Sequence, residues 1–189
     1  MPSTLELLRR LAAPPRIESC RRVLFVQPHP DDTDIGAGAT VARLARQGAE
    51  VFYLTVTDGS AGAAGSDADR RSLAALRRQE QERAAGILGV RRLLWLDYPD
   101  AGDYPEHRVR LDVIRAIREL EPELVVTVDP WSPYESHPDH RLCGLAVAGA
   151  ALLYALPTIR TDPEVDRRFR PYPLAGVAFY HTAHPNQYV

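Results

Sequence analysis

One pattern recurs four times along the sequence: an apolar run rich in β-branched residues, then a loop, then a stretch with helical periodicity. Runs that are apolar at nearly every position are typical of parallel strands buried on both faces. A helix between two such strands implies a right-handed crossover. The runs cover residues 22–27, 50–57, 91–97 and 123–129, and the helical stretches cover 38–47, 69–88, 108–120 and 140–156.

This alternation predicts the fold class. We expect a fifth strand over residues 174–180, and therefore an α/β, Rossmann-like three-layer sandwich with a mostly parallel sheet of about five strands. Residues 59–68, rich in Gly, Ala, Ser and Asp, and residues 156–173, which hold four prolines, are interpreted as loops. The first loop follows a strand on the side where α/β proteins bind ligands, so a mobile lid is one interpretation of it.

Charge and composition exclude several classes of function. The net charge of -2 and pI of about 6.3 argue against binding to nucleic acid or to an acidic membrane surface, because both need an excess of positive charge. All 23 basic residues are arginine, which excludes P-loop and Schiff-base chemistry because both need a lysine. Only two cysteines are present, Cys20 and Cys143, too few for a disulfide scaffold or a thiolate zinc knuckle.

The expected location follows from what the chain lacks. Residues 1–22 are arginine-rich and contain no continuous apolar run of the kind found in secretory signals. The longest nearly apolar stretch, residues 142–156, is shorter than the ~20 residues that a membrane-spanning helix needs. We therefore expect a soluble, cytoplasmic protein with no membrane partner.

Two short motifs concentrate the reactive side chains. The sequence PHPDDTD at residues 28–34 directly follows the first expected strand, and SHPDH at residues 136–140 follows the fourth. In a doubly wound sheet these two strands are neighbours at the topological switch point, and the crevice there is the usual ligand site. Two loops about a hundred residues apart should therefore meet in space.

The residue types in these motifs suit a divalent metal. Imidazole nitrogens and carboxylate oxygens bind zinc and similar ions, and catalytic zinc sites commonly keep three protein ligands and one open position. His29 and Asp32 are three residues apart around a proline-stiffened turn, so both can face one ion, and His140 would be the third ligand. The predicted cofactor is Zn²⁺ or another divalent metal.

The remaining motif residues suggest a hydrolase. Asp31 would lie beside the metal site, where a carboxylate can accept a proton from the attacking water. His137, if protonated and held by Asp139, would stabilise an oxyanion or protonate a leaving amine. Together these residues indicate metal-dependent hydrolysis of an amide or ester.

Other interpretations compete with this one. A single His-Pro-Asp sequence is usually only a turn, and the case for a site depends on having two at the ends of neighbouring strands. Gly36 and Gly38 resemble part of a dinucleotide-binding fingerprint, but the third glycine would fall at Val41. An NAD-dependent oxidoreductase is therefore disfavoured.

Four motifs together resemble the PIG-L or LmbE-like family. They are PHPDD at residues 28–32, an arginine-rich helix ending in AAGILG at 84–89, LDYPD at 96–100 and SHPDH at 136–140. The resemblance runs from about Arg22 to the chain end. It implies a zinc-dependent deacetylase of N-acetylglucosamine-containing molecules, a family that includes enzymes of mycothiol and bacillithiol synthesis.

The resemblance also implies a role for each matching residue. The roles of the motif residues agree with those argued above: His29, Asp32 and His140 as zinc ligands, Asp31 as general base, and His137 supported by Asp139. The family's sugar-contacting arginine and neighbouring glutamate match Arg77, Arg78 and Glu80, although a solvated helix face with charge pairs explains these residues equally well. Asp100 is expected to bind sugar hydroxyls, and Tyr134 lies close to a tyrosine that some members use.

The chain departs from the family pattern at three places. Asp34 stands where a glutamate is common, and Ala101 replaces the glycine of a Pro-Asp-Gly turn. The chain stops at Val189, where members usually continue into a further helix. We therefore expect one domain over residues 1–189 that lacks the family's C-terminal segment.

The functional expectation is removal of an N-acetyl group from a small amino-sugar substrate. One alternative is an amidase that cleaves a larger acyl group, such as a thiol-conjugate amidase. Another is a metal-binding subunit with impaired catalysis, which the short C-terminus suggests. A homo-oligomer in which a neighbouring chain completes the pocket would also account for the short C-terminus.

Overall fold

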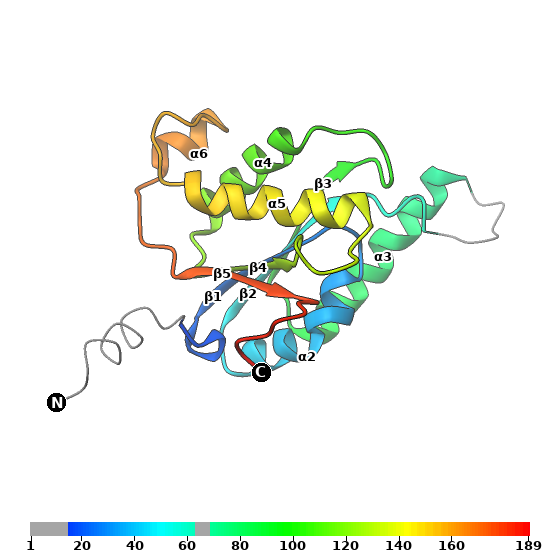
Figure 1. Ribbon diagram of the computed structural model, residues 1–189, viewed down its shortest axis with the longest axis horizontal. Coiled ribbons are helices and arrows are strands. Elements are labelled where there is room, and N and C mark those ends of the chain that lie inside the picture. The colour runs from blue at the N-terminus through cyan, green and yellow to red at the C-terminus, as the bar shows by residue number, and fades with distance from the viewer. Residues whose placement is uncertain (1–14, 63–68) are drawn as a thin grey trace.

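The computed structural model describes residues 15–62 and 69–189, and its centre is a five-stranded parallel sheet in the order β3-β2-β1-β4-β5 (Figure 1). The strands are β1 (Arg22–Gln27), β2 (Glu50–Thr57), β3 (Arg92–Tyr98), β4 (Leu124–Val128) and β5 (Gly176–Tyr180). The predicted α/β class with a parallel sheet is confirmed. In β1 the register places Val23 opposite both Val51 of β2 and Leu124 of β4, so the first and fourth strands are neighbours, as predicted.

Helices cover both faces of this sheet. A short 3-10 turn, η1 (Ile17–Ser19), precedes β1, and the α-helices are α2 (Asp32–Arg46), α3 (Arg70–Leu88), α4 (Glu106–Leu120), α5 (Pro138–Leu153) and α6 (Pro163–Arg168). Figure 1 shows α4 and α5 on one side of the sheet and α2 and α3 on the other. These layers give the three-layer sandwich that the β/α alternation predicts.

The core lies in two layers, one on each face of the sheet, because side chains alternate along every strand. In β1, Leu24 and Val26 pack with residues of α4 and α5. Val23 and Phe25 face the opposite way and pack with residues of α2. All four side chains are fully buried, which explains why the run carries no polar alternation.

One predicted helix and one predicted loop need correction. The helix expected over residues 38–47 begins at Asp32, inside the first motif, where Asp32 and Asp34 place negative charge in its first turn. The loop expected over residues 156–173 contains α6. Its signal was present in the sequence, because Asp162 accepts hydrogen bonds from the backbone N–H groups of Glu164 and Val165, and Pro163 occupies the first turn.

Two further expectations concern a mobile lid at residues 59–68 and the absence of a membrane-spanning helix. Residues 63–68 of the expected lid lie outside the described residues. Over the ranges 15–62 and 69–189, no helix is both long and apolar enough to cross a membrane.

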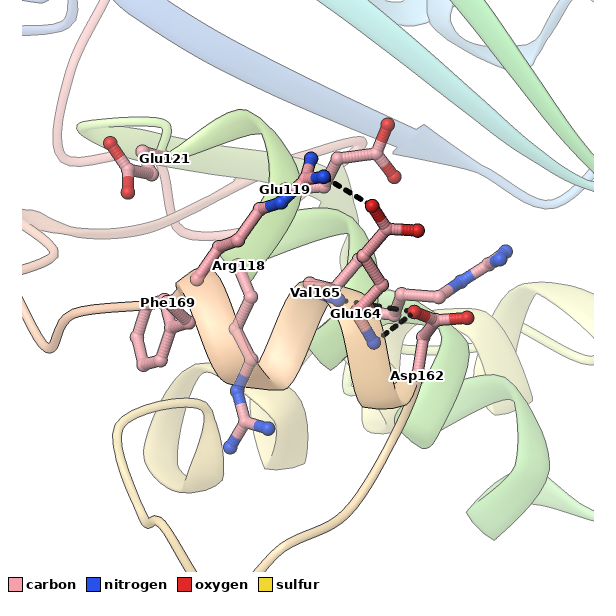
Figure 2. Close-up of a pocket in the computed structure, with 9 residues that line it drawn as sticks. Arg118, Glu119, Glu121, Asp162, Glu164, Val165 and Phe169 are labelled. Atoms are coloured by element: carbon pink, nitrogen blue, oxygen red, sulfur yellow. Dashed lines mark hydrogen bonds and ion pairs between the residues drawn. The ribbon is translucent and has the colours of Figure 1, made fainter.

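A buried arginine fixes the segment that leads to β5. Arg118 of α4 has a side chain only 3% exposed and forms an ion pair of 2.6 Å with Asp166 of α6. Its guanidinium also donates to the backbone carbonyls of Tyr154, Leu156 and Ile159. Figure 2 shows this arginine beside Val165 of α6 and Phe169, which follows the helix, in a cavity lined by side chains of both charges.

We predict that Arg118→Met destabilises the fold by about 3–5 kcal/mol, because Asp166 and three buried carbonyls lose their partner. Urea unfolding monitored by circular dichroism measures this change. The matched control is Arg168→Met, which removes the exposed ion pair to Glu164 on the same helix and should cost less than about 1 kcal/mol. Equal unfolding midpoints for the two variants would contradict the structural role of Arg118.

Candidate metal centre and active site

The two motifs lie together where β1 and β4 end, as the sequence predicts. The first forms the turn from β1 into α2, and the second leads from β4 into α5, with His137 as the N-cap of that helix. The helix α5 packs closely on the end of β4, since a Cβ at Gly144 would lie 2.7 Å from the carbonyl oxygen of Val128. The ring centroids of His29 and His137 are 4.6 Å apart, and those of His137 and His140 are 4.7 Å apart.

Three side chains form a group that could hold a metal ion, and we call this group the metal-ligand set. Asp32 lies between two histidines: its Oδ2 atom is 3.0 Å from Nδ1 of His29, and its Oδ1 atom is 3.4 Å from Nε2 of His140. One ligand atom from each residue lies within 4.8 Å of the other two. Two imidazoles and one carboxylate fit a divalent ion with an open coordination position, so the predicted ligands His29, Asp32 and His140 are brought together.

In His29 and His140, the ring nitrogen that does not face Asp32 also lies near a carboxylate. Nε2 of His29 lies 3.2 Å from Oδ2 of Asp139 and 3.4 Å from Oδ1 of Asp100. Nδ1 of His140 lies 3.0 Å from Oε2 of Glu135. Such carboxylate–histidine pairs orient metal-binding imidazoles and are typical of metal sites, which supports the fit of a metal here.

Electrostatics in the cluster favour a cation. Burial disfavours the charged form of His29, but hydrogen bonds to Asp139 and Asp32 outweigh burial and raise its pKa to about 10. Burial also opposes ionisation of Asp32, yet its bonds to His140 and His29 lower its pKa well below the usual range. A divalent ion is attracted by the same negative charge and competes with protons for the histidine nitrogens.

Asp31 is directed away from the ligand set, toward the cavity. It occupies the N-cap position of α2 with φ of 122°, yet its side chain caps no helix N–H group. The side chain of Gln27 does so instead, accepting a hydrogen bond of 3.0 Å from the N–H of Thr33. The Asp31 carboxylate is therefore free to form an ion pair with Arg77. Burial raises its pKa, and the positive charge of Arg77 opposes this rise.

A buried network of hydrogen bonds supports the turn from β1 into α2. Gln81 of α3 accepts a hydrogen bond from Gln27 and donates one to Asp34, each 2.9 Å long. Asp34 also accepts a hydrogen bond of 3.0 Å from the hydroxyl of Tyr53. The aspartate that departs from the family pattern is thus satisfied by two partners, and this network joins β1, β2, α2 and α3.

Asp139 holds His29 and not the His137 ring, which corrects the sequence interpretation. Its carboxylate accepts hydrogen bonds from the Tyr104 hydroxyl at 2.8 Å and the Ala101 N–H at 3.0 Å, besides its contact with His29. The support for His137 comes from the Asp139 backbone, whose N–H donates to Nδ1 of His137 at 3.3 Å. A neutral His137 therefore carries its proton on Nε2.

The neighbours of His137 favour this neutral form. Burial lowers the pKa of His137, and the positive charges of His29 and His140 lower it further. Its Nε2–H group is then a hydrogen-bond donor at neutral pH without an extra proton.

A cavity of about 320 Å³ opens beside these groups. It is lined by His29, Pro30, Asp31, Gly59, Ala61, Gly62, Arg77, Asp100, Ala101 and His137. Arg77 is fixed at its wall by Glu80, at 2.7 Å, and by the carbonyl of Pro30. Asp100 is almost fully buried and accepts a hydrogen bond of 2.9 Å from the N–H of Ala61. This bond connects the loop after β3 to the loop after β2.

Two residues expected to bind substrate do not line this cavity. Arg78 pairs with Asp97, and its guanidinium stacks 4.2 Å from the ring centroid of Trp95. Tyr134 is fully exposed and has a φ of 66°. The structure therefore brings Arg77 and Asp100 to the site and leaves Arg78 and Tyr134 outside it.

Sequence reasoning missed three residues that support the two motifs. Glu135 is an acid two residues before His137, so its proximity to the second motif was an available signal. Tyr104 is 35 residues from Asp139, and nothing in its sequence context links the two. Gln81 follows Arg77 by one helical turn, and only the structure shows that it is buried beneath the motif.

Comparison with known protein families identifies one match. Residues 24–151 match the family described as PIG-L: GlcNAc-PI de-N-acetylase. This range contains every residue of the metal-ligand set, Asp31, His137 and the cavity lining.

Two relatives are a little more than a third identical to this chain over the aligned residues. Diacetylchitobiose deacetylase from Thermococcus kodakarensis is 37% identical over 89% of this chain and 63% of its own length. A 1D-myo-inositol 2-acetamido-2-deoxy-alpha-D-glucopyranoside deacetylase from Kineococcus radiotolerans is 35% identical over 77% of this chain and 48% of its own length. The chain thus spans less than two thirds of the length of either relative.

A solved structure supports the same relationship. The fold superposes on N,N'-diacetylchitobiose deacetylase from Pyrococcus horikoshii, in complex with its inhibitor MPG, with a TM-score of 0.85 and 35% identity. The match covers 98% of this chain and 72% of the Pyrococcus chain.

Proposed function

The chain belongs to the PIG-L family, and from this premise we propose that it is a metal-dependent hydrolase that removes the N-acetyl group from an N-acetylglucosamine-type sugar. The relatives named above are deacetylases, which favours acetyl over a larger acyl group. One observation carries the proposal: His29 of the metal-ligand set, the Asp31 carboxylate and the His137 ring line one cavity.

We propose zinc as the metal, because two histidines and one carboxylate form a common catalytic zinc set. Zinc held by His29, Asp32 and His140 would supply Lewis acidity that polarises the acetyl carbonyl and makes a water molecule more acidic.

Asp31 is the general base in this proposal. Its carboxylate accepts a proton from water as the water oxygen forms a bond to the acetyl carbon. Arg77 holds the carboxylate in place, and burial raises the pKa of Asp31, which makes it a stronger base than an exposed aspartate. The same proton is then available for the amine nitrogen when the C–N bond breaks, which yields acetate and a free amino sugar.

His137 stabilises the negative charge that develops on the carbonyl oxygen. It does so as a neutral donor through Nε2–H, because Nδ1 accepts from the Asp139 backbone. Arg77 lies in the cavity wall beside Asp31, and Asp100 shapes the same wall through Ala61.

The experiment that tests this proposal combines metal analysis with acetate release. We expect the purified protein to contain about one zinc per chain and to release acetate from N,N'-diacetylchitobiose or N-acetylglucosamine. Removing the metal with a chelator should abolish release, and adding zinc should restore it. Protein without metal, or acetate release that survives complete metal removal, would contradict the proposal.

A further inference from the structure

Glu135 bridges two groups that the reaction needs. It lies in the loop between β4 and α5, and its side chain is 19% exposed. One carboxylate oxygen, Oε1, accepts a hydrogen bond of 2.8 Å from the N–H of His137. The other, Oε2, lies 3.0 Å from Nδ1 of His140. We propose that Glu135 is a positioning residue that fixes both the metal-ligand form of His140 and the backbone of His137.

The contact with His140 determines which of its nitrogens can bind a metal. Nε2 of His140 faces Asp32 in the ligand set, so this nitrogen needs a free lone pair. The proton of a neutral imidazole must then reside on Nδ1. A carboxylate beside Nδ1 can only accept a hydrogen bond, and it therefore selects the tautomer that leaves Nε2 free.

The contact with His137 fixes the start of α5. His137 is the N-cap of this helix, and its N–H group has no partner inside the helix. By accepting from that N–H group, Glu135 fixes the backbone from which the His137 ring extends. The ring stacks on His140 with an interplanar angle of 22°, so one carboxylate sets the relative position of the metal ligand and the oxyanion donor.

The backbone of the loop is consistent with this role. Tyr134 has a φ of 66°, a left-handed conformation that is unfavourable for a residue with a side chain. The Tyr134 side chain is fully exposed, so no buried contact of its own offsets the cost of this backbone conformation. The interactions that offset this cost are made by the next residue, Glu135, whose carboxylate contacts His137 and His140.

The sharpest test is Glu135→Gln. The two contacts use different carboxylate oxygens, so in glutamine one of them would face an NH₂ group, which is a donor, and would be lost. The substitution keeps the size of the side chain and leaves the rest of the loop unchanged. Glu164→Gln is the matched control, because Glu164 forms an exposed ion pair with Arg168 on α6.

We expect Glu135→Gln to weaken zinc binding by about 10–100-fold, measured by competition with a chelating dye. In zinc-loaded protein, the ¹⁵N signal of the Nδ1–H group of His140 should shift, because its acceptor changes from a carboxylate to an amide. At saturating zinc, kcat should fall while KM stays the same, since Glu135 does not line the cavity. Glu164→Gln should match the wild type in all three measurements.

The inference rests on the proposed function, yet the two can fail separately. Unchanged zinc affinity and an unchanged histidine spectrum in Glu135→Gln would overturn the positioning role, whatever the activity. Weaker zinc binding in the variant, with no acetate release from the zinc-loaded wild type, would support the positioning role and overturn the deacetylase proposal. Thermal unfolding of both variants confirms that folded proteins are compared.

Discussion

Replacing His140 with alanine is expected to leave a folded protein that neither retains zinc nor releases acetate. The imidazole supplies one of three ligand atoms, and its Nε2 lies 3.4 Å from Asp32. Loss of a direct ligand should weaken metal binding by more than the roughly 10–100-fold that the loss of a supporting residue causes. Metal analysis after gel filtration, together with acetate release, measures both effects.

The matched control for this variant is His107→Ala. His107 is an exposed histidine in the first turn of α4, so its removal should change neither metal content nor activity. If His140→Ala retained one tightly bound zinc per chain, the ligand assignment would be wrong. Added zinc should not restore activity to His140→Ala at concentrations that saturate the wild type.

The second large effect is expected for Asp31→Asn, which should bind zinc like the wild type and lose about 10²–10⁴-fold in kcat. General acid–base catalysis contributes that range, and an amide cannot accept the proton. The zinc site should survive because the Asp31 side chain points to Arg77 and away from the ligand set. Steady-state kinetics on zinc-loaded protein measures the loss.

The pH dependence of the wild type provides an independent check on Asp31. Burial raises the pKa of this carboxyl above 3.8, so kcat/KM should fall on acidification at a pH higher than an ordinary aspartate would give. Asp97→Asn is the matched control, because Asp97 is exposed and pairs with Arg78 outside the cavity. A decrease of less than tenfold in Asp31→Asn, with metal bound, would exclude Asp31 as the base.

The fold was largely predictable because its signals are local and repeated. The bounds of β1 and β2 agree with the predicted runs, and those of β3 and β4 agree to within one residue at each end. Strands buried on both faces must be apolar throughout, so the pattern in the sequence reports burial directly. The start of α2 was less predictable, because a helix that begins inside a Pro-Asp-rich motif lacks an apolar period there.

The meeting of the candidate ligands was predictable for a topological reason. Parallel strands place their carboxyl ends at one edge, and the doubly wound order makes β1 and β4 neighbours. Motifs that follow these two strands must therefore meet, even though a hundred residues separate them. The identities of His29, Asp32, His140 and Asp31 followed from that placement and from ligand chemistry.

The partners of these residues were not predictable. Sequence spacing suggested that the Asp139 carboxylate supports His137, two residues away, but the carboxylate lies against His29. Helix geometry explains this, since residues two apart on a helix do not face each other. Arg77 and Arg78 are adjacent in sequence, yet only Arg77 reaches the cavity, because neighbouring side chains on a helix point about 100° apart.

The sequence by itself determined the parallel α/β sheet, the edge where the two motifs meet and the candidate metal ligands brought together there, because local periodicity and strand order require this arrangement. Only the tertiary structure decided which carboxylate holds which imidazole, with Asp139 on His29 and Glu135 on His140. Hydrogen bonds depend on side-chain direction at distances near 3 Å, and that direction is set by the packing of several elements rather than by residue spacing.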